Sequence, residues 1–133
     1  MKGSCLCNSV QYVVTRLATA IVHCSCKTCR KAHSAAFNTG AGVMAEDFSW
    51  TRGQSELTAY ESSPGKKRYF CKKCGSQILA IKEGSPHYVL RVATLDEDPE
   101  SLPQYRIWKS QEVSWLNYEN SIPAYEEWKP ESI

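Results

Sequence analysis

Residues 22–31 read VHCSCKTCRK, and this stretch holds Cys24, Cys26 and Cys29 within six residues. Thiolates so close together repel one another unless a cation binds them, and Zn²⁺ is the usual cation for thiolate ligands in proteins. The spacing C-x-C-x-x-C suits three ligands on one side of a metal, which we expect a strand end and the following turn to supply. A fourth coordination position would then be free, as is typical of zinc sites that perform chemistry.

The remaining cysteines form a second set. Cys5 and Cys7 make a C-x-C pair, and Cys71 and Cys74 make a C-x-x-C pair that Gly75 follows directly. The seven cysteines of the chain therefore divide into four plus three, with none left over. We expect the four-cysteine set to form a zinc knuckle that ties the N-terminus to the middle of the chain, so that each chain binds two Zn²⁺ ions.

Other interpretations fit this cysteine pattern less well. A disulfide framework is disfavoured because the count is odd and because C-x-C neighbours are hard to join without strain. A thioredoxin-like motif at Cys71 and Cys74 lacks the surrounding βαβ pattern. Cys5 and Cys7 could be small buried hydrophobic residues, but the second pair downstream favours metal binding. Free thiols as ligands indicate a reducing compartment, so we expect the protein in the cytoplasm.

Composition narrows the class of protein. The 133 residues suffice for a single domain over 1–133, with 42% hydrophobic and 23% charged residues. Seven thiolates and two Zn²⁺ ions would change the formal charge from +2 to −1, so the mildly basic sequence does not predict a nucleic-acid partner. No apolar run is long enough to cross a membrane, and we see no signal peptide. The oligomeric state is left open.

Short strands separated by turns predict a mainly β fold. We expect strands at 10–15, 19–24, 35–43, 48–52, 56–61, 66–70, 77–81, 87–92 and 105–108. Few short helical turns are expected, at 45–48 and at the acidic segment 96–102. Cys5 and Cys7 would lie on an extended strand, where residues two apart face the same side. The tail carries Trp115, Tyr118, Tyr125 and Trp128, which would cap the core or form a wall of the active cavity.

Three residues near the cluster of Cys24, Cys26 and Cys29 are candidates for catalysis. His23 could orient substrate or complete the metal shell, although strand alternation favours a position facing away from Cys24. Arg30 could hold an anionic thiol substrate, because zinc with three thiolates carries a net negative charge that opposes an incoming anion. His33 could be a fourth ligand or an acid/base group. The general acid and base stay unassigned.

Five segments are distinctive in order and spacing: GSCLC at 3–7, HCSCKTCRK at 23–31, YESSPGK at 60–66, FCKKCGS at 70–76 and IPAYEEW at 122–128. In these segments the chain resembles the glutathione-dependent formaldehyde-activating enzyme family, which also includes centromere protein V. The resemblance implies a β-tent-like fold of folded-over antiparallel sheets pinned by zinc. It also implies a structural zinc on Cys5, Cys7, Cys71 and Cys74, and a catalytic zinc on Cys24, Cys26 and Cys29.

The resemblance implies the joining of glutathione and formaldehyde to give S-hydroxymethylglutathione, which is classed as a carbon–sulfur lyase reaction in the reverse sense. A thiol at the open position of zinc would lose its proton and could then add to an aldehyde. The partners would be a small thiol and a small aldehyde, and a related enzyme could use different ones. The alternative is a non-enzymatic zinc-binding interaction module, in which His23 or His33 would complete a closed four-ligand shell.

Overall fold

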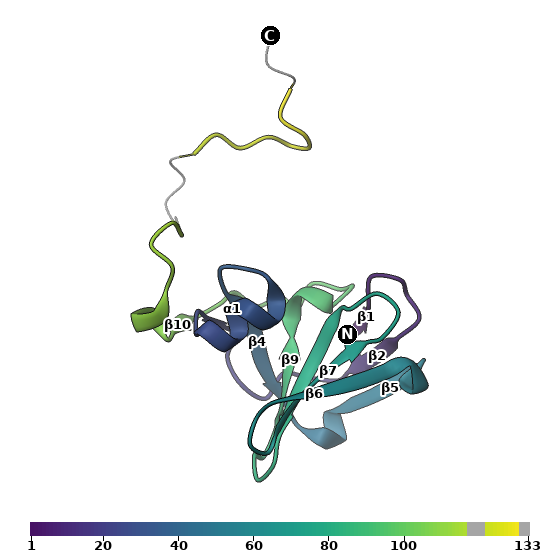
Figure 1. The fold of residues 1–133 in the computed structure, drawn as a ribbon. Coiled ribbons are helices and arrows are strands. Elements are labelled where there is room, and N and C mark those ends of the chain that lie inside the picture. The colour runs from purple at the N-terminus through teal and green to yellow at the C-terminus, as the bar shows by residue number, and fades with distance from the viewer. Residues whose placement is uncertain (117–121, 131–133) are drawn as a thin grey trace.

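The structure is a computed structural model that describes residues 1–116 and 122–130 (Figure 1). Its strands are β1 (Lys2–Ser4), β2 (Gln11–Val14), β3 (Val22–Cys24), β4 (Asn38–Val43), β5 (Phe48–Arg52), β6 (Leu57–Ser63), β7 (Lys66–Cys71), β8 (Gln77–Lys82), β9 (Tyr88–Arg91) and β10 (Tyr105–Ile107). The described α-helix is α1 (Lys27–His33), and short 3₁₀ turns lie at Ala45–Asp47, Gln54–Glu56, Val92–Thr94 and Lys109–Gln111.

The strands form two sheets. A three-stranded sheet has the order β1-β2-β5, and a seven-stranded sheet has the order β10-β3-β4-β9-β8-β7-β6. Neighbouring strands pair antiparallel except β10, which runs parallel to β3 at the edge of the larger sheet. The predicted mainly β fold of antiparallel sheets is therefore confirmed, and the strand predictions are correct apart from small differences at their ends. The parallel edge pair was not foreseen.

The core lies between the two sheets and contains mostly β-branched and aromatic side chains. The largest fully buried side chains include Tyr12 of β2, Ile78 and Leu79 of β8, and Leu90 of β9. Burying each such side chain contributes roughly 1.5–3 kcal/mol. The Tyr12 hydroxyl, which burial would otherwise leave unpaired, shares a 2.7 Å hydrogen bond with the Thr94 hydroxyl. The hydrogen bond of the Tyr12 hydroxyl and the packing of its ring thus favour the same side-chain position.

Two local predictions about the cysteines were wrong. Cys5 and Cys7 do not lie on a strand, because β1 ends at Ser4 and the chain turns at Asn8, which has φ 64°. The stretch after Cys24 is not merely a turn but begins helix α1, with Cys26 as its N-cap. A seven-residue helix is too short to produce a clear apolar stripe, so its sequence pattern is weak.

The C-terminal prediction was also wrong where it can be compared. Trp115 is 71% exposed and Trp128 is 92% exposed, so neither caps the core. Tyr118 lies outside the described residues. The acidic segment 96–102 forms bends rather than a helical turn. In residues 1–116 and 122–130, no helix is long and apolar enough to span a membrane.

Candidate metal centre

The four-cysteine cluster joins the N-terminal turn to the hairpin between β7 and β8. Its four Sγ atoms, from Cys5, Cys7, Cys71 and Cys74, all lie within 4.8 Å of one another. The Cys7 Sγ is 3.6 Å from the Cys5 Sγ and 3.8 Å from the Cys71 Sγ. Tetrahedral zinc with Zn–S bonds of about 2.3 Å requires S···S separations of about 3.8 Å, so this donor set fits such an ion.

The turn around this cluster has the backbone geometry of a zinc knuckle. Gly75 has φ 79°, and its N–H donates a 2.7 Å hydrogen bond to the Cys71 carbonyl. A positive φ favours glycine because other side chains are strained there. The Val10 N–H also donates to the Cys5 Sγ over 3.3 Å, so backbone dipoles face the sulfur atoms.

The second cluster lies where β3 ends and α1 begins. The Sγ atoms of Cys24, Cys26 and Cys29 lie within 4.8 Å of one another, and Cys24 and Cys29 are buried. The Cys26 Sγ accepts a 3.3 Å hydrogen bond from the Cys29 N–H and so caps the helix. The C-x-C-x-x-C spacing therefore uses one strand end, one helix cap and one residue of the first helical turn.

The thiols of this cluster strongly influence one another. Hydrogen bonds from Cys24 and Cys26, together with Arg68, lower the pKa of Cys29 to about 5. The same interaction with Cys29, together with burial, raises the pKa of Cys24 far above its ordinary value. Opposite shifts within one cluster mean that three thiolates do not coexist there without a compensating cation. The chemistry of the donor set thus fits a divalent soft-ligand metal.

Neither nearby histidine joins this set of donors. Among the described residues, the group contains the three cysteines alone. His23 faces away from Cys24, because its Nδ1 shares a 2.9 Å hydrogen bond with the Thr39 hydroxyl and its ring packs on Phe37. The prediction that strand alternation turns His23 away is confirmed. A role for His23 in the site stays a prediction.

The two other catalytic candidates, Arg30 and His33, lie on helix α1. The Arg30 Nε donates a 3.3 Å hydrogen bond to the Ser25 carbonyl, which ties the helix to the loop before it. His33 is the last residue of α1, and its Nε2 is buried without a hydrogen-bond partner. Burial, with the nearby charges of Arg91 and Arg68, lowers the pKa of His33 to about 4, so its imidazole is neutral at ordinary pH. Catalytic roles for both residues stay predictions.

A cavity of about 340 Å³ adjoins the three-cysteine cluster. Its lining includes Cys24, Cys29 and Asn38, together with the positively charged Lys66 and Arg91. Asn38 is 6% exposed and is one of the few buried polar side chains. Two of the three cysteines therefore line a space that is large enough for a small molecule.

The family assignment follows from comparison with known proteins. The sequence profile described as "Glutathione-dependent formaldehyde-activating enzyme" matches residues 1–111. The chain belongs to this family. A protein of Podospora anserina, provisionally named a glutathione-dependent formaldehyde-activating enzyme, is 32% identical over 90 residues. That alignment covers 65% of this chain and only 42% of the fungal protein.

A solved relative supports the fold of this family member. The crystal structure of a Rhodobacter sphaeroides protein superimposes with a TM-score of 0.65 at 28% sequence identity. The match covers 80% of this chain and 98% of that chain. The sequence resemblance drawn from the cysteine motifs is thus confirmed.

Sequence reasoning missed two arginines of this glutathione-dependent formaldehyde-activating enzyme family member. Directly opposed residues on neighbouring strands project to the same face of a sheet. The sheet register places these residues directly opposite each other: Cys24 and Asn38, Gly40 and Arg91, Val89 and Ala80, and Ala80 and Arg68. Asn38 and Gly40 are two residues apart on β4, as are Val89 and Arg91 on β9, so each of these pairs also shares a face. Arg68 and Arg91 thus share a face with Cys24, although they are far from it in sequence. The local sequence carries no signal for Arg68, which follows Lys66 and Lys67 in a basic run, so the strand order was needed to find this pair.

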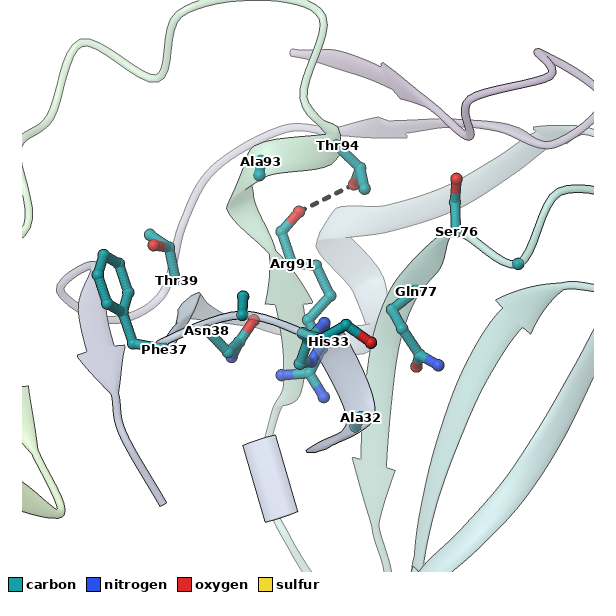
Figure 2. Close-up of a pocket in the computed structure, with 13 residues that line it drawn as sticks. Ala32, His33, Phe37, Asn38, Thr39, Ser76, Gln77, Arg91, Ala93 and Thr94 are labelled. Atoms are coloured by element: carbon teal, nitrogen blue, oxygen red, sulfur yellow. Dashed lines mark hydrogen bonds between the residues drawn. The ribbon is translucent and has the colours of Figure 1, made fainter. Parts of the chain in front are cut away.

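A second cavity, of about 470 Å³, adjoins the first at Asn38 and Arg91, which line both (Figure 2). Figure 2 shows the Arg91 side chain running from β9 to a guanidinium beside His33. Gln77 lines the same cavity, and its Oε1 is buried without a hydrogen-bond partner. Arg91, His33 and Gln77, which each carry a buried polar atom without a hydrogen-bond partner, therefore line the same cavity.

Proposed function

We propose that the chain is a zinc-dependent carbon–sulfur lyase of the glutathione-dependent formaldehyde-activating type. It adds glutathione or a similar thiol to formaldehyde or another small aldehyde. The observation that carries this proposal is the set of three cysteines beside a cavity, with no fourth protein ligand among the described residues. A site of this kind leaves a position for substrate. A protein of this type would act in the cytoplasm, where its thiol ligands stay reduced.

Two zinc sites follow from the donor sets. Cys5, Cys7, Cys71 and Cys74 would hold a structural ion, and Cys24, Cys26 and Cys29 would hold the catalytic one. Zinc bound at the second site would lower the pKa of a substrate thiol and so supply a thiolate nucleophile.

The residues around the cavity have separate roles in the addition. Lys66 and Arg91 supply positive charge that favours an anionic substrate. Burial and the charge of Arg68 lower the pKa of Lys66, which suits its Nζ to exchange a proton with the reacting groups. The buried Asn38 side chain lines the same space and can orient the aldehyde by hydrogen bonding.

The alternative function is a non-enzymatic interaction module on the same fold. That function predicts a closed shell of four protein ligands at both clusters. Among the described residues, neither His23 nor His33 joins Cys24, Cys26 and Cys29 as a fourth ligand, which favours the enzyme.

The test compares the wild-type protein with a Cys26→Ser variant, both purified without chelator. Serine is a preferred helix N-cap, so this variant removes the sulfur ligand while keeping the cap of α1. NMR exchange measurements with glutathione and ¹³C-formaldehyde give the rate of S-hydroxymethylglutathione formation above the spontaneous rate. We expect acceleration by the wild type alone. Equal rates for wild type, variant and buffer would refute the proposed function.

A further inference from the structure

Arg68 of β7 and Arg91 of β9 are both buried, at 3% and 4% exposure. Arginine is always charged, so each guanidinium requires compensation in the interior. Yet among residues 1–116 and 122–130, the ion pairs involve neither arginine. Their proximity has an electrostatic effect, since burial and the charge of Arg68 lower the pKa of Arg91 to about 10. Zinc with three thiolates, of which Arg68 contacts Cys29, would carry a single negative charge, which leaves one of the two buried cations uncompensated and indicates a place for a further anion.

The guanidinium nitrogens without hydrogen-bond partners show where an anion could bind. Arg68 uses its Nε to donate to the Ser62 hydroxyl at 2.9 Å and its Nη2 to contact the Cys29 Sγ at 3.8 Å. Its Nη1 has no partner. Arg91 has two unpartnered nitrogens, Nε and Nη2. These two nitrogens form one edge of the guanidinium plane, with parallel N–H groups that match the two oxygens of a carboxylate.

The chemistry of this edge distinguishes a carboxylate from a single oxyanion. An alkoxide oxygen would engage one donor well, whereas a carboxylate engages both N–H groups of the fork. The Arg91 side chain lines the cavity that contains Cys24 and Cys29, and Arg68 contacts Cys29 directly. An anion held here therefore lies beside the three-cysteine cluster. The carboxylates of glutathione lie at the ends of the tripeptide, remote from its sulfur, so they fit this position poorly.

We propose that Arg91, with Arg68, binds a carboxylate carried by the aldehyde substrate, so that the preferred aldehyde has an acid group next to its carbonyl carbon. This inference rests on the proposed function. In the reaction, the thiol sulfur bonds to the aldehyde carbon, the π electrons of C=O move to oxygen, and the proton lost by the thiol ends on that oxygen. The product is a hemithioacetal, and the carboxylate is unchanged.

The first experiment measures binding to the metal-loaded protein and needs no turnover. Formate and glyoxylate are the carboxylate probes, and glycolaldehyde is the neutral aldehyde control, each at equal ionic strength with chloride. We expect formate and glyoxylate, but not glycolaldehyde, to raise the Tm in a saturable manner. Arg91→Lys keeps the charge but removes the fork, and should weaken formate binding about tenfold. Arg52→Gln alters an exposed arginine and should leave binding unchanged.

If Arg91→Lys does not fold, the wild type alone tests the proposal. Formate binding no stronger than that of chloride would overturn it. Formate binding that Arg91→Lys leaves intact would overturn the assigned site.

A second experiment assigns the carboxylate to one substrate. Glyoxylate should react faster than glycolaldehyde with a neutral thiol such as 2-mercaptoethanol. If the two aldehydes react equally while 3-mercaptopropionate is preferred over 2-mercaptoethanol, the carboxylate belongs to the thiol, and the proposal for the aldehyde is wrong. Formate binding through Arg91 without thiol addition to any aldehyde would refute the proposed function and the substrate assignment, while leaving the anion site established.

Discussion

The His23 imidazole and the Thr39 hydroxyl share a 2.9 Å hydrogen bond on the sheet face opposite to Cys24. We therefore expect His23 to be a structural link between β3 and β4 rather than a metal ligand. We expect His23→Gln to keep the zinc content of the wild type and to lower the free energy of unfolding by about 1 kcal/mol. Metal analysis by mass spectrometry checks the zinc content, with Cys24→Ser as the variant expected to lose one ion. Urea unfolding checks the free energy. Loss of one zinc in His23→Gln would contradict the interpretation.

The two cysteine clusters should differ in their effect on stability. Cys74→Ser removes a ligand that joins the N-terminal turn to β7 and β8, so it should lower the Tm by roughly 10 °C or more. Cys26→Ser affects a cluster formed within one local segment, and it should lower the Tm by much less while losing one zinc. Calorimetry together with metal analysis distinguishes these outcomes. Equal losses of Tm would mean that both clusters are structural.

Asp47 should make stability depend on pH. Hydrogen bonds from the Thr15 hydroxyl and the Arg16 guanidinium hold the pKa of Asp47 below its ordinary value of 3.8. A lowered folded-state pKa stabilises the fold above the unfolded-state value, and this stabilisation is lost as the pH falls through the folded-state value. Asp47→Asn should therefore be less stable than wild type at neutral pH and should approach it in acid.

Denaturant unfolding across this pH range tests the role of Asp47, with Glu46→Gln as a control at the exposed neighbouring carboxylate. A stability difference for Asp47→Asn that does not shrink in acid would show that packing, rather than charge, carries the effect.

The exposed tail gives a prediction that contrasts two tryptophans. Trp128 is 92% exposed, so Trp128→Ala should change the free energy of unfolding by no more than about 0.5 kcal/mol. Trp50 packs edge-on against Phe48 with ring centroids 4.7 Å apart, so Trp50→Ala should cost about 2 kcal/mol or more. Urea unfolding of both variants provides the comparison. A large loss in Trp128→Ala would mean that the tail packs on the body in solution.

Much of the strand pattern and both cysteine clusters could be predicted from sequence. The strands are short and bounded by turn residues, and the cysteine pairs are joined by a local spacing rule. The arginine pair could not be predicted, because Arg68 and Arg91 meet only through the order of β7, β8 and β9. Helix α1 was missed since a thiol, not an apolar stripe, defines its start. Residue spacing within one segment can be predicted from sequence, whereas contacts between distant segments depend on the strand order.

The four-cysteine cluster also constrains the order of events during synthesis. Cys7 and Cys71, which contact each other in the folded protein, are 64 residues apart. At ribosomal rates of about 5–20 residues per second, the second pair follows the first by roughly 3–13 seconds. During that interval the nascent chain carries two thiols without their partners, exposed to oxidants and competing metals. If this cluster binds zinc as proposed, the N-terminal turn cannot be fixed to β7 and β8 until Cys74 has been translated.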